Sequence, residues 1–152
     1  TRRSSDLKSG GYLTTAFYCI YDHAKMSLDY SRAGHSLPYI IRNGSAEKIT
    51  SDGYILGAKK NPEFESKKIQ LQKGDKLLLF TDGLIETANR EYITFETVIS
   101  ETLLKHSHRN INDFVKNIYN DCSAFRDGSF FEDDISIIGI EVTGNSSGRN
   151  RK

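Results

Sequence analysis

Two groups of carboxylates stand where an apolar run of the chain meets a polar one. Asp82 follows the apolar residues 77–80 closely, and Asp133 and Asp134 stand just before the β-branched residues 135–142. Carboxylates beside buried strands are costly to desolvate unless they are paired or bound to a cation. Hard divalent ions such as Mg²⁺ and Mn²⁺ prefer oxygen ligands, commonly one or two carboxylates together with several waters. If the two runs are neighbouring strands, these carboxylates meet at one sheet edge and supply half of a metal site.

Simpler interpretations of the polar residues stay open. The pair Asp82-Gly83 is also typical of a turn after a strand, and an aspartate before a strand is often an ordinary loop residue. His35 follows a glycine, so it either contacts a substrate or caps a bend between strands. His106 and His108 resemble a metal-binding pair, but they stand in a polar segment at a helix end, and this position favours solvated side chains.

The elements that must position these residues follow from the periodicity of apolar side chains. Runs that are β-branched, aromatic, or apolar at every second position predict strands. These runs cover residues 15–21, 26–31, 37–41, 46–49, 67–71, 77–80 and 135–142. A hairpin signal, Asn43-Gly44, joins two of the early strands, so residues 15–49 are predicted to form an antiparallel meander. Residues 77–80 are apolar on both faces, which suits a strand buried on both sides.

The apolar period changes between the last two predicted strands. From residue 95 to residue 103, apolar side chains recur at the spacing of one helix face. A second helix is predicted from Asn110, a good N-cap residue, to about residue 125. Many short strands, then two helices, then a final strand predict an α+β domain built in layers.

The composition is that of a single soluble domain. The 152 residues include 21 basic and 20 acidic side chains, mixed along the chain, and the net charge is +1. This balance lacks the basic footprint of a nucleic-acid-binding protein. The two cysteines have no metal-binding or disulfide-framework spacing. Because no apolar run approaches the ~18 residues of a membrane span and no signal peptide is seen, we expect a cytoplasmic protein without a membrane segment.

Three segments are similar to the motifs of one enzyme family. They are residues 33–38 (AGHSLP), 71–86 (LQKGDKLLLFTDGLIE) and 133–136 (DDIS). The family is that of the PPM-type metal-dependent serine/threonine phosphatases, and the similarity is strongest to its bacterial SpoIIE/RsbU-like branch. The resemblance extends over residues 11–142 and keeps the order of the family's motifs.

The resemblance implies an antiparallel β-sandwich flanked by α-helices, with a centre of two Mn²⁺ or Mg²⁺ ions at one end. The metal-binding aspartates of the family's motifs correspond to Asp82 and Asp133. Asp134 and Gly83 would support these ligands or act through a bound water. Two ions of this kind activate a water molecule and stabilise the phosphoryl oxygens, so no nucleophilic side chain is required.

One part of the family's pattern is missing from this sequence. The family carries a metal-bridging Asp-Gly in a glycine- and histidine-rich segment upstream, whereas Asp6 is followed here by Leu7. We therefore expect residues 12–143 to be the C-terminal portion of the phosphatase domain, lacking its N-terminal strands. A flexible segment, residues 1–11, would precede it and a disordered tail, residues 144–152, would follow. Alone, this portion is expected to be inactive, and its exposed sheet edge favours a dimer.

Two functions from different classes follow from the resemblance. The first is a metal-dependent phosphatase that acts on phosphoserine or phosphothreonine in a small regulatory protein of the anti-sigma-factor-antagonist type. Such an enzyme would work in bacterial partner-switching or stress signalling, under an upstream sensor or regulatory domain. The second is a catalytically inactive phosphatase-like module that binds such a partner. A structural β-sandwich whose acidic loops have no function is a third alternative.

Overall fold

The computed structural model describes residues 13–128 and 130–144, and seven strands in this part of the chain form two antiparallel sheets. The smaller sheet has the order β1-β2-β5 and contains β1 (Ala16–Asp22), β2 (Ser27–Ala33) and β5 (Ser66–Gln70). The larger sheet has the order β4-β3-β6-β7 and contains β3 (Tyr39–Arg42), β4 (Ser45–Lys48), β6 (Lys76–Phe80) and β7 (Ile137–Glu141). The predicted flexible segment 1–11 and all of the predicted tail except Gly144 lie outside the described residues.

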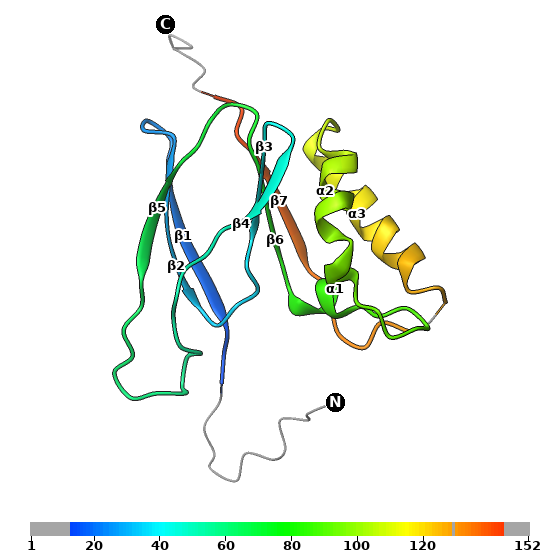
Figure 1. Ribbon diagram of the computed structural model, residues 1–152. Coiled ribbons are helices and arrows are strands. Elements are labelled where there is room, and N and C mark those ends of the chain that lie inside the picture. The colour runs from blue at the N-terminus through cyan, green and yellow to red at the C-terminus, as the bar shows by residue number, and fades with distance from the viewer. Residues whose placement is uncertain (1–12, 129, 145–152) are drawn as a thin grey trace, which may run out of the picture.

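Helices form the third layer of the molecule. They are α1 (Asp82–Glu86), the 3₁₀ turn η2 (Phe95–Thr97), α2 (Ile99–His106) and α3 (Ile111–Phe125). Figure 1 shows the smaller sheet on one side, the larger sheet in the middle, and α2 and α3 covering the other face of the larger sheet. This antiparallel sandwich flanked by helices confirms the predicted fold class.

The predicted meander over residues 15–49 is wrong, because its strands belong to different sheets. The β2 strand pairs with β1 and β5, whereas β3 pairs with β4 and β6. Between β2 and β3 the chain crosses from one sheet to the other. Gly34 lies at the start of this crossing with a backbone φ of 68°, a conformation that residues with a Cβ atom rarely adopt. The early strands are thus two hairpins, one in each sheet.

The two longer helices match the prediction in place and differ in one boundary. The segment predicted as one helix from Phe95 begins as the 3₁₀ turn η2, and the α-helix starts only at Ile99. Asn110 caps α3 as predicted, since its side-chain oxygen accepts a hydrogen bond from the Asp113 amide at 3.0 Å. The short helix α1, which starts at Asp82, was not predicted, because five residues are too few to show a helical period.

The core has two parts, separated by the larger sheet. Leu77 of β6 faces the smaller sheet, with Leu28 and Ile40. The next residue, Leu78, faces the helices and packs with Phe114 and other side chains of the second cluster. Neither Leu77 nor Leu78 is more than 2% exposed. The prediction that this strand is buried on both faces is therefore confirmed, and β6 is the central support for whatever lies at its C-terminal end.

A buried ion pair ties the turn before β6 to both sheets. Asp75 has a side chain only 3% exposed and accepts two hydrogen bonds from Arg42, at 2.9 and 2.6 Å. The same carboxylate accepts the Gln72 amide at 2.6 Å, which closes the turn between β5 and β6. Arg42 also donates to the Gln70 carbonyl at 2.7 Å. Because Arg42 lies in the larger sheet and Gln70 in the smaller one, this pair joins the two sheets; hydrogen bonding to Asp75 raises the pKa of Arg42.

The expectation that His106 is solvated is wrong. Its side chain is buried, and its Nε2 lies 2.9 Å from the Asp121 carboxylate of α3. The reason is its place in α2, three residues after Leu103, on the face that packs against α3. Burial raises the pKa of Asp121, but hydrogen bonds from Lys105 and His106 outweigh it and hold that pKa below its usual value. His108 is exposed, as predicted.

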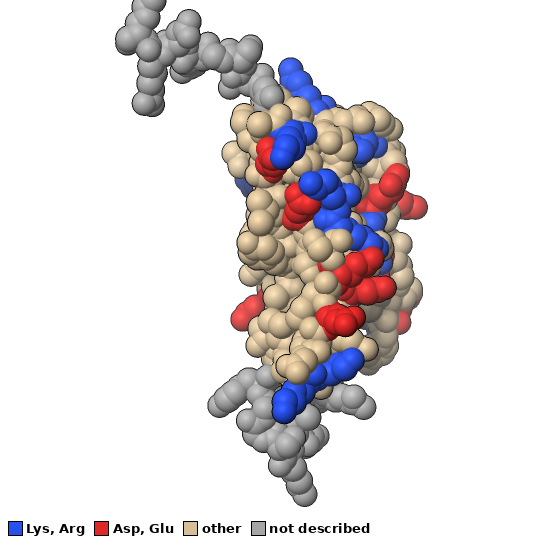
Figure 2. Space-filling view, turned by 90° about the vertical axis from the view of Figure 1, so that its left-hand side faces the viewer, with Lys and Arg blue, Asp and Glu red and all other residues tan. Residues whose placement is uncertain are grey.

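Charged side chains on the smaller sheet stand in pairs of opposite sign. Lys68 lies 3.2 Å from Asp29 across the β2–β5 ladder, and Lys67 lies 3.2 Å from Glu65. Figure 2 shows basic and acidic side chains next to one another on this side of the molecule.

Among residues 13–128 and 130–144, no helix has both the length and the apolar character needed to span a bilayer.

Candidate active site

The pairing of β6 with β7 brings the two groups of carboxylates to one end of the larger sheet. The register pairs Phe80 with Ile137, so the residues that follow β6 lie beside those that precede β7. The Thr81 amide donates to the Ser136 carbonyl at 3.1 Å and continues the ladder by one step. Asp82 and Asp133 therefore stand on adjacent segments of chain. The strand after Asp134 begins at Ile137, two residues later than predicted.

Thr81 joins the two segments through its side chain. Its hydroxyl donates to the Asp134 carbonyl at 2.9 Å and accepts the Ser136 amide at 2.9 Å. Both partners of the hydroxyl belong to the backbone of the acidic segment, so the position of Asp133 and Asp134 is set by Thr81 as much as by β7. Threonine suits this place because its hydroxyl is both a donor and an acceptor.

Gly83 allows the two backbones to approach closely. A Cβ atom at this position would lie 2.6 Å from the Asp134 carbonyl oxygen and 3.2 Å from that of Asp133. The first of these distances is shorter than any ordinary carbon–oxygen contact, so only glycine fits without a shift of the backbone. The glycine after Asp82 is thus explained by the packing of α1 on the acidic segment, and not by a turn.

The carboxylates themselves are exposed and partly held by their own backbone. One oxygen of Asp82 accepts the Gly83 amide at 3.1 Å, and one oxygen of Asp133 accepts the Asp134 amide at 2.7 Å. Each side chain keeps a second oxygen that can face a cation. In the part of the chain that the structure describes, no group of three or more His, Cys, Asp or Glu side chains could hold a metal ion. The donor set fits a hard cation that keeps several water ligands, and it fits half of a two-ion centre.

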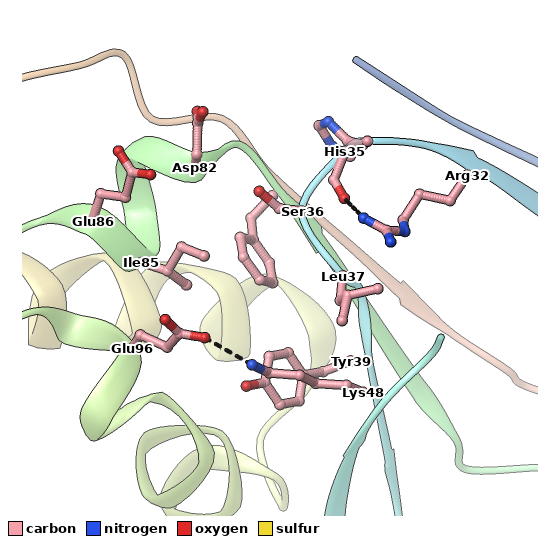
Figure 3. A pocket seen from close by; sticks show the side chains of 12 residues that line it. Arg32, His35, Ser36, Leu37, Tyr39, Lys48, Asp82, Ile85, Glu86 and Glu96 are labelled. Atoms are coloured by element: carbon pink, nitrogen blue, oxygen red, sulfur yellow. Dashed lines mark hydrogen bonds and ion pairs between the residues drawn. The ribbon is translucent and has the colours of Figure 1, made fainter. Parts of the chain in front are cut away.

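A cleft of about 320 Å³ opens beside Asp82 (Figure 3). One wall comes from α1 and η2, and the other comes from the crossing between β2 and β3. The residues that line it are Arg32, Gly34, His35, Ser36, Leu37, Tyr39, Lys48, Phe80, Asp82, Ile85, Glu86 and Glu96. The sequence motifs pointed to Asp82 and His35 alone. Tyr39, Lys48 and Glu96 were missed, because they come from three separate elements that no short motif connects.

His35 lies on the wall opposite α1 and is held from two sides. Its Nδ1 lies 3.2 Å from the Thr15 hydroxyl, and its carbonyl oxygen accepts a hydrogen bond from Arg32 at 3.0 Å. Arg32 also donates to the Ser51 carbonyl at 2.8 Å, so it anchors the crossing to the segment after β4. These contacts support a structural role for the His35 backbone. Contact of its ring with a substrate stays a prediction.

Lys48 and Glu96 form an ion pair across the cleft. The ammonium of Lys48 lies 2.8 Å from the Glu96 carboxylate and 5.8 Å from the centre of the Tyr39 ring. The hydrogen bond with Glu96 raises the pKa of Lys48. Both side chains are well exposed, at 40% and 51%, so a ligand in the cleft can reach either of them.

Replacing Gly83 by alanine is expected to weaken Mn²⁺ binding by about tenfold or more, although the change removes no carboxylate. The added methyl group must push α1 away from the acidic segment, which separates Asp82 from Asp133 and costs about 1–3 kcal/mol of stability. Calorimetric titration of the full-length protein with Mn²⁺, together with urea unfolding, measures both effects.

Gly74→Ala is the matched control, because Gly74 has a positive φ of 92° but open space around it. That variant should lose stability and keep its metal affinity. Unchanged Mn²⁺ affinity in Gly83→Ala would contradict the backbone packing as the origin of the ligand spacing.

Comparison with known proteins identifies relatives of the chain. A family model described as Stage II sporulation protein E (SpoIIE) matches residues 2–143. Phosphoserine phosphatase RsbU of Bacillus subtilis is 25% identical over 126 residues, which are 82% of this chain and 38% of RsbU. Protein IcfG of Synechocystis is 25% identical over 130 residues, which are 83% of this chain and 20% of IcfG. The chain thus spans well under half the length of these curated relatives.

Solved structures share the fold described above. The PP2C phosphatase domain of SpoIIE from Bacillus subtilis, solved with a fragment of its regulatory domain, superposes with a TM-score of 0.77 at 18% identity. The match covers 92% of this chain and 41% of that one. The SiaA-PP2C domain of Pseudomonas aeruginosa gives a TM-score of 0.74 at 17% identity, covering 84% of this chain and 51% of that one.

Proposed function

Because this chain belongs to the SpoIIE family, we propose that it forms part of a Mn²⁺- or Mg²⁺-dependent protein phosphatase that acts on phosphoserine or phosphothreonine. The observation that carries the proposal is that the chain after β6, with Asp82, lies beside the chain before β7, with Asp133, and that Thr81 and Gly83 join the two segments. Of the alternatives, a structural sandwich with incidental acidic loops does not account for a threonine and a glycine that both fix the backbone of the acidic segment beside Asp82.

Each residue of the site then has a distinct task. Asp82 and Asp133 would hold the metal ions through the oxygens that do not bond to the backbone. Thr81 and Gly83 would set the distance between these ligands, and Asp134 would support them or act through water. Two bound ions would supply an activated water and charge that stabilises the phosphoryl oxygens. The cleft beside Asp82 would receive the part of the substrate next to the phosphate.

The substrate is proposed to be a small regulatory protein of the anti-sigma-factor-antagonist type in a bacterial partner-switching pathway in the cytoplasm. This proposal is supported by the similarity to RsbU, a phosphoserine phosphatase, and to a Mycobacterium tuberculosis protein that carries RsbU and RsbW domains. An upstream sensor or regulatory domain fits the length of the curated relatives. Self-association fits the position of β1 and β7 as edge strands of their sheets.

A phosphatase assay on the full-length protein tests the main proposal. We expect release of phosphate from a phosphoserine protein in the presence of Mn²⁺ and its loss on addition of a chelator. Calorimetric titration of residues 1–152 with Mn²⁺ should give an affinity in the millimolar range, since the described residues offer two carboxylates for an ion that prefers more protein or water oxygens. Phosphatase activity that is unaffected by chelator would contradict the metal-dependent mechanism.

A catalytically inactive binding module is the second candidate. It is favoured by one observation: among residues 13–128 and 130–144, no group of three or more His, Cys, Asp or Glu side chains could hold a metal ion. The two candidates differ in the full-length protein. If that protein binds its phosphorylated partner with Mn²⁺ present and releases no phosphate, the binding module is correct and the enzyme is not.

Residues 50–64 are expected to dock the protein substrate. This segment leaves the larger sheet after β4 and exposes Tyr54 and Leu56. It also packs on the crossing that borders the cleft, where a Cβ atom at Gly34 would meet the Ile55 side chain. Exchange of residues 53–60 for a glycine-serine linker should therefore impair dephosphorylation of the protein substrate by about tenfold more than hydrolysis of p-nitrophenyl phosphate. Paired kcat/KM measurements check this, and equal losses on both substrates would mean that the segment supports the site and does not dock the partner.

A further inference from the structure

The cleft beside Asp82 has an apolar floor and polar walls. Tyr39 and Phe80 stack at a centroid distance of 6.1 Å and form the base, with Leu37 and Ile85 beside them. Figure 3 shows the carboxylates of Asp82, Glu86 and Glu96 on one side of this space. A long side chain with an aliphatic stem and a polar end matches such a cleft, because the stem contacts the floor while the end reaches the wall.

The carboxylates on the α1 side do not share the same partners. Asp82 is the proposed metal ligand, so bound cations would neutralise it. Glu96 forms the ion pair with Lys48 at 2.8 Å. Glu86 is exposed and lines the cleft, and among residues 13–128 and 130–144 its carboxylate has no hydrogen-bond or ion-pair partner. Its negative charge is therefore the one that a ligand in the cleft would meet uncompensated.

Among the described residues that line the cleft, the cations opposite α1 already have partners. The guanidinium of Arg32 is held by the carbonyl oxygens of Ser51 and His35, at 2.8 and 3.0 Å. Lys48 is held by Glu96. An acidic substrate side chain could bind only the N–H groups of Arg32 that these carbonyls leave free, or displace Glu96 from Lys48, and it would also approach Glu86. A basic side chain can pair with Glu86 without competing for an existing contact, so the charges on the α1 side of the cleft favour it.

We propose that the cleft receives a lysine or arginine side chain that lies close to the phosphoserine of the substrate, and that Glu86 binds its charged end. The inference rests on the proposed function, because Asp82 marks where the phosphate is bound. Asp82 and Glu86 are four residues apart in α1, so their side chains are neighbours on one helix face, with Cβ atoms about 5–6 Å apart. An extended peptide advances about 3.3 Å per residue. The basic residue should therefore stand within two positions of the phosphoserine.

The test uses the full-length protein with Mn²⁺ and phosphoserine peptides of one neutral background sequence. A single lysine is placed at each position from two before to two after the phosphoserine, and glutamine at the same position is the reference. At one position we expect lysine to raise kcat/KM by about fivefold over glutamine, the discrimination that one partly exposed ion pair supplies. In Glu86→Gln this ratio should fall to about one, and in Glu86→Lys a glutamate peptide should become the better substrate.

Glu91→Gln is the matched control, since Glu91 is an exposed glutamate that does not line the cleft. This variant should keep the full preference for lysine. A wild-type enzyme without a positional preference, or a preference that survives in Glu86→Gln, would overturn the proposal. So would a preference for glutamate in the wild type, which would assign the cleft to Arg32 or Lys48.

Binding separates failure of this inference from failure of the proposed function. Fluorescence anisotropy of the same labelled peptides with the full-length protein needs no turnover. If the protein hydrolyses none of the peptides, the phosphatase assignment fails; the cleft is then judged by whether the lysine peptide binds about fivefold more tightly than the glutamine peptide and loses this advantage in Glu86→Gln. Equal binding of the two peptides would overturn the inference whether or not the protein is an enzyme.

Discussion

Replacing either Asp82 or Asp133 by asparagine is expected to lower the Mn²⁺-dependent phosphatase activity of the full-length protein by more than about a hundredfold. Loss of a residue that merely supports a metal ligand costs about 10–100-fold in affinity or activity, and loss of a ligand should exceed that. An amide of the same shape keeps a neutral oxygen but removes the charge that a hard cation requires. Initial rates on a phosphoserine protein, measured over a range of Mn²⁺ concentrations, give the effect on both turnover and metal affinity.

The fold should survive these two substitutions, because both carboxylates are exposed and their hydrogen bonds to the neighbouring amides can be kept by an amide oxygen. Circular dichroism and urea unfolding check this point. Asp134→Asn is the comparison within the same segment, and its effect should be smaller, since Asp134 contacts Thr81 through its backbone carbonyl, which the substitution keeps. Near-wild-type turnover in Asp82→Asn or Asp133→Asn would refute the metal site, and a loss in Asp134→Asn as deep as in Asp133→Asn would mean that the neighbouring aspartate is the ligand.

Replacing Asp75 by alanine is expected to be the most destabilising single change of a polar residue in the fold, by about 3–5 kcal/mol. The substitution leaves the Arg42 guanidinium without its buried partner and the Gln72 amide without an acceptor. It also removes the side-chain link between the turn before β6 and Arg42 of the larger sheet. The side chain of Arg42 is 27% exposed, so its guanidinium can recover some hydration when Asp75 is removed. The expected loss of stability therefore lies towards the lower end of that range. Urea unfolding of residues 1–152, followed by circular dichroism, measures the free energy of unfolding.

Asp29→Ala is the matched control for Asp75→Ala. Asp29 also pairs with a basic side chain, at 3.2 Å from Lys68, but both partners are about half exposed. Exposed pairs of this kind contribute about 0–1 kcal/mol. A loss of stability in Asp75→Ala no larger than in Asp29→Ala would show that the buried pair does not hold the sheets together.

The strands and the two longer helices could be predicted from the sequence, because their signals are local. Residues 77–80 form an apolar run that only a strand covered on both faces can use, and β6 is that strand. Asn110 marked the start of α3 because its side chain caps the helix that directly follows it. The same local order placed one carboxylate after β6 and two before β7. That these groups meet needed one further condition, the antiparallel pairing of β6 with β7.

What the local signals could not decide is which surfaces pack together. The predicted meander failed because a hairpin signal specifies its own two strands and says nothing of the next neighbour, so the division of β2 and β3 between two sheets followed only from tertiary packing. His106 was taken for a solvated residue, and its burial depends on α3 lying against α2. The cleft also depends on tertiary packing, since Lys48 and Glu96 are far apart in the sequence and become partners only when β4 lies beside η2. Residue types and spacing therefore determined the elements and the candidate ligands, whereas tertiary packing decided the neighbours of each ligand, because contacts between distant segments carry no periodic signal along the chain.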